Sequence, residues 1–219
     1  MDALHLRRPK TYREERWTVP SWELEHAAAS QGYAAVCGCD EAGAGPLAGR
    51  VYAAAVILPD RLELPWLNDS KQVTEKRREV LYGQITAQAA AWSVAWVEPG
   101  EIDEIDILNS RIKAMQLAID GLEPTADFAL IDGNRDHGSR CAIAVPHKLV
   151  VKGDSLSMSI AAASILAKVS RDRYMREMAV LYPQYEFERH KGYPTKRHYQ
   201  LLWEFGPCSI HRRSFLKKL

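Results

Sequence analysis

Four carboxylates interrupt the apolar pattern of this 219-residue sequence instead of lying on polar helix faces. Asp40 and Glu41 follow one short apolar run, Asp132 ends a second, and Asp154 ends a third just before a long helical segment. Side chains at the carboxyl ends of strands in an α/β sheet converge on one edge, where ligands bind. We therefore expect the four to share a site. Alternatively, each Asp caps a helix or closes a turn, as Asp-Gly and Gly-Asp dipeptides often do.

Four acidic groups in one pocket repel one another, so something must neutralise them. Hard divalent cations such as Mg2+ and Mn2+ prefer oxygen ligands and would do so. Two such ions about 4 Å apart can hold a scissile phosphate, one activating the attacking water and the other stabilising the leaving oxygen. The pattern thus favours metal-dependent hydrolysis of a phosphodiester.

A glycine-rich segment, residues 43–49, follows Asp40 and Glu41 directly. Exposed backbone N–H groups in such a segment could bind a phosphate or a sugar hydroxyl. The segment is not a P-loop, because the Gly-Lys-Ser/Thr ending is missing. A simple connection between two strands is the alternative interpretation.

The elements around these residues predict an α/β protein with a mixed sheet. Short apolar runs predict strands at residues 34–39, 50–58, 91–97, 127–131 and 142–151. Helical spacing and capping residues predict helices at residues 22–29, 69–90 (opened by Thr74), 102–122, 157–178 and 195–204.

Charge is distributed unevenly along the chain, although the net charge is only +1. Residues 168–219 hold 12 Lys and Arg against 5 Asp and Glu, and the other residues hold 17 against 23. A basic surface beside clustered carboxylates suits a metal-dependent enzyme that acts on a polyanion. A solvated helical surface rich in Lys and Arg would give the same count.

Composition excludes several classes of protein. The longest apolar run, residues 51–58, is too short to span a bilayer, and the charged first residues lack the apolar stretch of a signal peptide. The four cysteines form neither a disulfide framework nor a zinc motif, and we expect Cys37 and Cys39 to be buried free thiols. We therefore expect a cytoplasmic protein that is neither exported nor bound to a membrane.

Eight segments, in order and at the family's spacing, resemble bacterial ribonuclease HII, a type 2 ribonuclease H family. They are DEAGAGPLAG (40–49), NDSK with EKRR (68–78), IDEIDILN (102–109), IDGNR (131–135), VKGD (151–154), SIAAASILAK (159–168), HKGYPT (190–195) and IHRRSF (210–215). The resemblance extends from about residue 22 to residue 215 and implies an RNase H-like fold. That fold is a five-stranded mixed sheet flanked by helices, with a small helical carboxyl-terminal region.

The implied domains are a polar segment and helix (1–33), a catalytic domain (34–182) and a basic helical region packed on it (183–219). The implied activity is endonucleolytic hydrolysis, with Mg2+ or Mn2+, of the RNA strand in RNA/DNA hybrids and on the 5′ side of ribonucleotides embedded in duplex DNA. It leaves 3′-hydroxyl and 5′-phosphate ends. By similarity, the metal-binding catalytic residues are Asp40, Glu41, Asp132 and Asp154, which hold two ions during catalysis.

The family reads the junction between RNA and DNA with a Gly-Arg-Gly turn and a tyrosine. These match Gly43-Ala44-Gly45 and Tyr193, whose ring could stack on the deoxyribose next to the ribonucleotide. Backbone amides suit the 2′-hydroxyl, which distinguishes ribose from deoxyribose. Ala44 departs from the family's Arg, so we expect weaker junction selectivity, with an enzyme tuned to longer RNA tracts as one alternative.

Basic residues near the implied site are the remaining candidates. Lys152 and Lys71 could contact phosphate or be ordinary surface lysines, and His211 could be a packed capping residue. We expect a basic face that holds the duplex backbone, formed by His190, Lys191, Arg212 and Arg213.

A non-catalytic hybrid-binding module is the alternative from another functional class, although all four carboxylates are present. We expect a monomer, and the ending at residues 215–219 is too short to identify a peptide that binds a sliding clamp.

Overall fold

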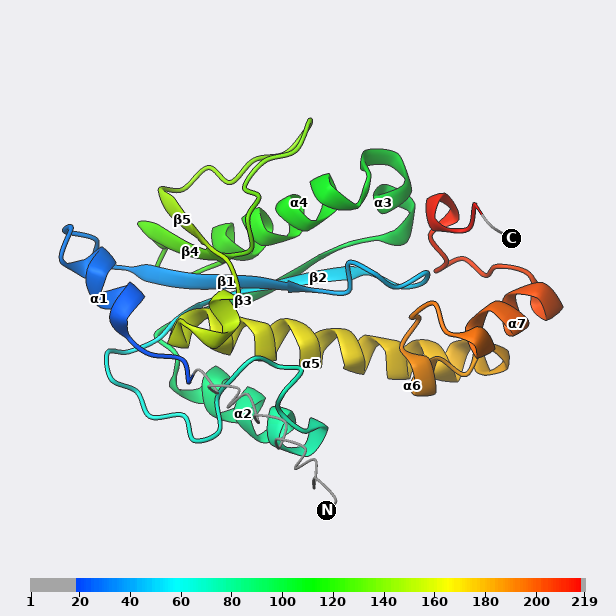
Figure 1. Ribbon diagram of the computed structural model, residues 1–219, viewed down its shortest axis with the longest axis horizontal. Helices are drawn as coiled ribbons and strands as arrows, with labels where there is room; N and C mark the ends of the chain where they lie inside the picture. The colour runs from blue at the N-terminus through cyan, green and yellow to red at the C-terminus, as the bar shows by residue number, and fades with distance from the viewer. Residues whose placement is uncertain (1–18, 218–219) are drawn as a thin grey trace, which may run out of the picture.

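The computed structural model describes residues 19–217, and one five-stranded mixed sheet forms its centre (Figure 1). The strand order is β3-β2-β1-β4-β5. The β1–β2 and β2–β3 pairs are antiparallel, and the β1–β4 and β4–β5 pairs are parallel. The strands are β1 (Val36–Ala42), β2 (Val51–Ile57), β3 (Ala91–Val97), β4 (Phe128–Asp132) and β5 (His147–Val150). The mixed five-stranded sheet that the resemblance predicts is confirmed.

Helices cover both faces of this sheet (Figure 1). One face packs against α4 (Ile107–Asp120) and the other against α5 (Met158–Leu181). Alternate side chains of β2 serve the two faces, because successive residues of a strand point in opposite directions: Ala53 and Ala55 face α4, and Ala54 and Val56 face α5. The other helices are α1 (Glu23–Ala29), α2 (Glu75–Gln88), α3 (Pro99–Ile105), α6 (Phe187–His190) and α7 (Lys196–Phe205).

Hydroxyl side chains begin three of the helices. The side chains of Thr74, Ser157 and Thr195 accept hydrogen bonds from backbone N–H groups in the first turns of α2, α5 and α7. Such caps satisfy N–H groups that have no partner within the helix. The helix starts predicted at these three residues are confirmed.

Three predicted elements were wrong in extent. The helix predicted over residues 102–122 is two helices, because Asp106 adopts a φ of 68° and its carboxylate caps α4 by accepting from the N–H of Asn109. The strand predicted over 142–151 shortens to β5, since Pro146 has no N–H to donate to a ladder. β1 continues beyond residue 39, so Asp40 and Glu41 lie within the strand.

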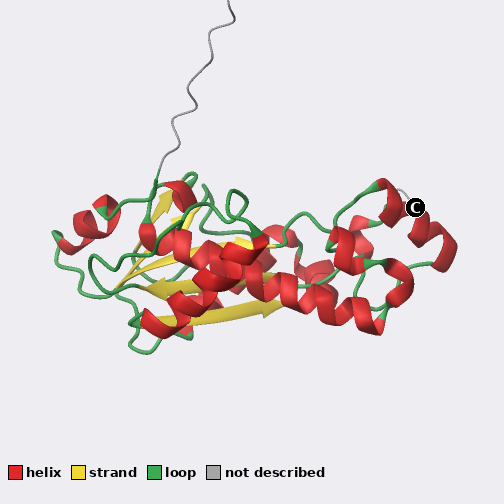
Figure 2. Ribbon diagram, turned by 90° about the horizontal axis from the view of Figure 1, so that it is seen from below, coloured by secondary structure: helices red, strands yellow, loops and turns green. Residues whose placement is uncertain are grey.

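The carboxyl-terminal residues gather around the far end of α5, beyond the strands (Figure 2). They form the short 3-10 helices η2 (Pro183–Tyr185) and η3 (Arg213–Phe215) together with α6 and α7. Residues 1–18 of the predicted amino-terminal segment and residues 218–219 of the chain's ending lie outside the described part. Among the described helices, none combines the length and the apolar character needed to cross a membrane.

Candidate active site

Four carboxylates line a single pocket of about 420 Å³ near the carboxyl ends of the inner strands β1 and β4. Asp40 lies in β1 and Asp132 ends β4, and the parallel pairing of Cys39 with Ile131 just before them places the two aspartates on neighbouring strands. Glu41 follows in β1, and Asp154 belongs to the 3-10 helix η1 (Gly153–Ser155) after β5. The structure therefore brings together all four acidic residues that the sequence singled out.

Hydrogen bonds from the protein hold three of these carboxylates. Asp40 Oδ1 accepts from the N–H of Glu41 at 2.7 Å. Asp132 Oδ1 accepts from the N–H of Gly153 at 2.7 Å, which ties β4 to η1. Glu41 Oε1 pairs with Nη2 of Arg111 on α4 at 2.6 Å. The other oxygen of Glu41, Oε2, is buried and has no hydrogen-bond partner within residues 19–217.

Burial and mutual repulsion raise the pKa values of three of the four acids. The pKa of Asp40 lies well above its usual range because the carboxyl is buried and Glu41, Asp132 and Asp154 surround it. Burial also raises the pKa of Glu41, against the lowering effect of Arg111. The pKa of Asp154 rises to about 6 through burial and the charges of Asp69 and Asp132. The pocket thus disfavours its own negative charge and would bind cations.

The donor set fits a hard divalent cation, because it consists of carboxylate oxygens and includes the unpartnered Oε2 of Glu41. The carboxylates are not already arranged as a metal site. In residues 19–217, no three His, Cys, Asp or Glu side chains lie close enough together to hold an ion.

The two predicted lysines lie in different places. Lys71 lines the pocket, and although burial lowers its pKa, the nearby charges of Asp69, Asp154 and Asp40 raise it overall. Lys152 is exposed beside η1, in a left-handed backbone conformation, and is not part of the pocket lining.

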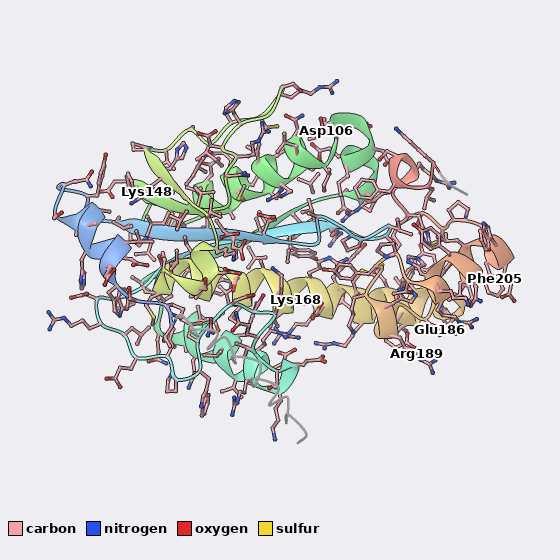
Figure 3. The ribbon with its side chains drawn as sticks, in the orientation of Figure 1. Asp106, Lys148, Lys168, Glu186, Arg189 and Phe205 are labelled. Atoms are coloured by element: carbon pink, nitrogen blue, oxygen red, sulfur yellow. The ribbon has the colours of Figure 1, made fainter. Side chains whose placement is uncertain are left out.

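Two further cations line the pocket, Lys168 and Arg171 of α5, and the sequence motifs had predicted no role for either (Lys168 is labelled in Figure 3). Nζ of Lys168 donates to both oxygens of Asp172, at 2.6 and 2.8 Å. Arg171 is fully buried. Helical spacing could have placed both on the sheet-facing side, because they lie seven and ten residues after Ala161.

The glycine-rich turn and Tyr193 share the pocket with the carboxylates. Gly43, Ala44, Gly45 and Tyr193 all line it. Tyr193 is 41% exposed, and the guanidinium carbon of Arg171 lies 5.5 Å from the centroid of its ring. The turn and the tyrosine, to which the resemblance gives the reading of a junction, therefore line the same pocket.

The prediction that Arg212 belongs to a basic face is wrong. Its side chain is fully buried, and its guanidinium donates to backbone carbonyls of residues 43–49. His190 is also buried, with its ring bonded to the carbonyl of Tyr185. Arg213 is exposed and Lys191 is partly buried, so these two remain available for a duplex backbone.

A family model described as ribonuclease HII matches residues 37–218. The chain belongs to the ribonuclease HII family. It is 48% identical over 198 residues to ribonuclease HII of Caldicellulosiruptor saccharolyticus, covering 90% of this chain and 95% of that one. It is 50% identical over 180 residues to ribonuclease HII of Idiomarina loihiensis, covering 82% and 94%. The protein is thus a type 2 ribonuclease H, a hydrolase with endonuclease activity.

Solved structures agree with this fold. The crystal structure of ribonuclease H2 from Pyrococcus horikoshii superposes with a TM-score of 0.69 at 25% identity, covering 83% of this chain and 93% of that one. The ribonuclease HII in a complex with PCNA from Archaeoglobus fulgidus gives a TM-score of 0.67 at 24% identity, covering 85% and 96%. The RNase H-like fold implied by the sequence resemblance is confirmed.

Proposed function

We propose that the protein cuts the RNA strand of RNA/DNA hybrids and the 5′ side of ribonucleotides embedded in duplex DNA. The products would carry 3′-hydroxyl and 5′-phosphate ends. The observation that carries this proposal is the gathering of four carboxylates in one pocket, which a glycine-rich turn and Tyr193 also line. Membership of the ribonuclease HII family supports the substrate class.

In this proposal Asp40, Glu41, Asp132 and Asp154 hold Mg2+ or Mn2+, with two ions present during catalysis. When bound, such ions lower the pKa of water and neutralise charge on the leaving oxygen. The turn at Ala44 offers backbone N–H groups to the 2′-hydroxyl of the ribonucleotide.

Cations and an aromatic ring complete the substrate contacts. Lys71 and Lys168 lie in the pocket, where they would pair with phosphate oxygens beside the scissile bond. The half-exposed ring of Tyr193 would stack on the neighbouring deoxyribose.

Two experiments, the removal of metal and the substitution of one carboxylate, test whether this site cleaves the substrate. EDTA should abolish cleavage of a labelled duplex that carries one ribonucleotide, and Mg2+ or Mn2+ should restore it. Asp132→Asn should abolish turnover in either metal, because the site loses one of its oxygen ligands, while gel-shift measurements should show that hybrid binding persists. Asp120→Asn, which removes an exposed charge at the end of α4, is the matched control and should cleave normally. Turnover by Asp132→Asn would contradict the assignment of the site.

A further inference from the structure

Arg212 is a fully buried cation that forms no ion pair with a carboxylate of residues 19–217. Its guanidinium instead donates to four backbone carbonyls of one short segment, those of Gly49 (2.9 Å), Ala44 (3.0 Å), Pro46 (2.9 Å) and Gly43 (2.7 Å). Burying an unpaired charge is costly, and burial lowers the pKa of Arg212 to about 9. The guanidinium is thus buried at a cost in free energy, and its hydrogen bonds all go to the turn that lines the active site. We therefore looked for a functional role of Arg212 in that turn.

Peptide geometry fixes where the other side of this turn points. The C=O and N–H of a planar trans peptide point in opposite directions, and the peptides of this turn are trans. Because the carbonyls of Gly43 and Ala44 point inward to Arg212, the N–H groups of Ala44 and Gly45 point away from it. Neither N–H donates to another group within residues 19–217, and both residues line the carboxylate pocket.

The turn is held from two sides. Arg171 lies against Gly43 so closely that a Cβ at this position would be 2.2 Å from its Nε, and Gly43 has a φ of +97° that other residues rarely adopt. On the other side, the backbone N–H of Arg212 donates to the carbonyl of Leu47 and that of Gly49 donates to Ile210, both at 2.8 Å. The carboxyl-terminal segment therefore delivers a guanidinium to a fixed place under the turn.

We propose that Arg212 is a positioning residue that directs and polarises the N–H groups of Ala44 and Gly45 for binding the ribose 2′-hydroxyl. This inference rests on the proposed function. A hydrogen bond to a cation at each carbonyl strengthens the donor at the other end of the same peptide, because hydrogen bonds in series polarise one another. Arg212 thereby supplies positive charge to ribose recognition from beneath, in a chain whose residue 44 has no charged side chain, and without contacting substrate.

The decisive measurement compares binding of two duplexes in the cleavage-silent Asp132→Asn background. One duplex carries a single ribonucleotide and the other is the same sequence in DNA, and fluorescence anisotropy gives both dissociation constants. Arg212→Lys should reduce the preference for the ribonucleotide about tenfold, because lysine cannot bridge four carbonyls. The dependence of binding on salt concentration should stay as it is, because Arg212 contacts no phosphate.

Two neighbouring variants separate positioning from other roles. Arg213→Gln removes the adjacent, exposed cation, so it should weaken both duplexes equally and reduce the salt slope by about one. Asp103→Ala loosens the same segment, because Asp103 accepts from the N–H groups of Arg213 and Ser214. It removes none of the four hydrogen bonds of the guanidinium, although it removes a carboxylate whose charge acts on Arg212, and it should keep the preference for the ribonucleotide.

Amide resonances provide a readout that needs no substrate. In 15N-labelled protein, Arg212→Lys should move the Ala44 and Gly45 amide protons upfield, and Asp103→Ala should not. If Arg212→Lys does not fold, Phe215→Leu replaces it, since it removes the ring that lies 5.2 Å from the guanidinium carbon and should act in the same direction.

Several outcomes would overturn the proposal. One is that Arg212→Lys changes neither the preference for the ribonucleotide duplex nor the Ala44 and Gly45 amide resonances. Another is that Arg212→Lys lowers the salt slope as Arg213→Gln does. A third is that Asp103→Ala loses as much of the preference as Arg212→Lys. Absence of metal-dependent cleavage by the unmodified protein would instead overturn the proposed function.

Discussion

Ala44 stands where the resemblance to ribonuclease HII implies an arginine. Ala44 lines the carboxylate pocket, where an arginine would add a cation. A charge-assisted hydrogen bond to phosphate contributes roughly 1.5 to 3 kcal/mol, which corresponds to about tenfold to a hundredfold in binding. Ala44→Arg should therefore increase selectivity for a duplex with one ribonucleotide over a uniform RNA/DNA hybrid. The ratio of kcat/KM on the two substrates measures this, and an unchanged ratio would contradict it.

The carboxylate pocket carries its own electrostatic cost at the scale of single residues. The pKa of Asp154 in the folded protein is about 6, raised by burial, Asp69 and Asp132 from an ordinary value of 3.8. Its ionised form is therefore destabilised by folding. This cost is present above pH 6 and disappears as the pH falls from 6 towards 3.8.

Asp154→Asn should consequently stabilise the protein at pH 8 without metal, by roughly 1 to 3 kcal/mol after allowance for screening by water in the open pocket. Urea denaturation in EDTA measures the change. Repetition at pH 4 is the control, where the gain should vanish because the wild-type carboxyl is protonated. A gain of equal size at both pH values would show that repulsion is not its source.

At the scale of elements, β1 and α5 approach so closely that a glycine is required between them. A Cβ on Gly38 would lie 2.1 Å from the backbone carbonyl carbon of Ser159, where no flexible side chain can yield. This contact brings the start of α5 against the strand that carries Asp40 and Glu41.

Gly38→Ala should therefore destabilise the protein by about 3 kcal/mol, at the upper end of the usual cost of overpacking. Gly83→Ala is the matched control, because Gly83 is exposed in α2 with nothing within 4 Å of the added Cβ. It should stabilise the protein by about 0.5 to 1 kcal/mol, since alanine favours a helix over glycine. Thermal unfolding of both variants tests the pair, and a Gly38→Ala protein as stable as the wild type would refute the close contact.

The positions of most elements were predictable because they depend on local patterns. Apolar runs predicted β2 and β3, and hydroxyl capping residues predicted the starts of α2, α5 and α7. The break at Asp106 escaped prediction because apolar spacing continues through it, and only the capping bond to Asn109 reveals two helices.

Part of the site was likewise predictable from the sequence, and part was not. The four carboxylates follow or end apolar runs, so their convergence at one sheet edge follows from topology. The burial of Arg212 did not follow from the sequence, because its acceptors are carbonyls more than 160 positions away, and a backbone carbonyl leaves no mark in a sequence. Arginine in a basic segment ordinarily indicates a solvated surface.

At the scale of the whole molecule, the carboxyl-terminal region connects the active site to a buried chain of histidines. Nδ1 of His198 bonds the carbonyl of Tyr193 at 3.0 Å, so this nitrogen carries the proton. Nε2 of His198 must then accept from Nε2 of His211, at 3.1 Å, and Nδ1 of His211 accepts the N–H of Cys208 at 2.9 Å. Each ring is neutral in this arrangement, and protonation of either would break it.

The same chain predicts how stability depends on pH. Burial lowers the pKa of both His198 and His211 to about 4. His190 adds repulsion at both rings, and His198 and Arg213 add it at His211. Because these values lie below the ordinary 6.5, the unfolded chain binds protons more readily. Stability from this cluster is complete above pH 6.5 and is lost as the pH falls towards 4.

His211→Gln provides the comparison that isolates the cluster. Asp40 and Asp154, with raised pKa values, contribute the opposite slope in both proteins, so the difference in unfolding free energy between wild type and variant cancels them. That difference should be largest at pH 8 and shrink by roughly 2 to 3 kcal/mol by pH 4, as the wild type alone pays to keep His211 neutral. Urea denaturation across this range measures it. Parallel curves would mean that His211 binds a proton as readily in the folded protein as in the unfolded chain, and that the bonded chain from Cys208 to Tyr193 does not hold the residue that lines the pocket.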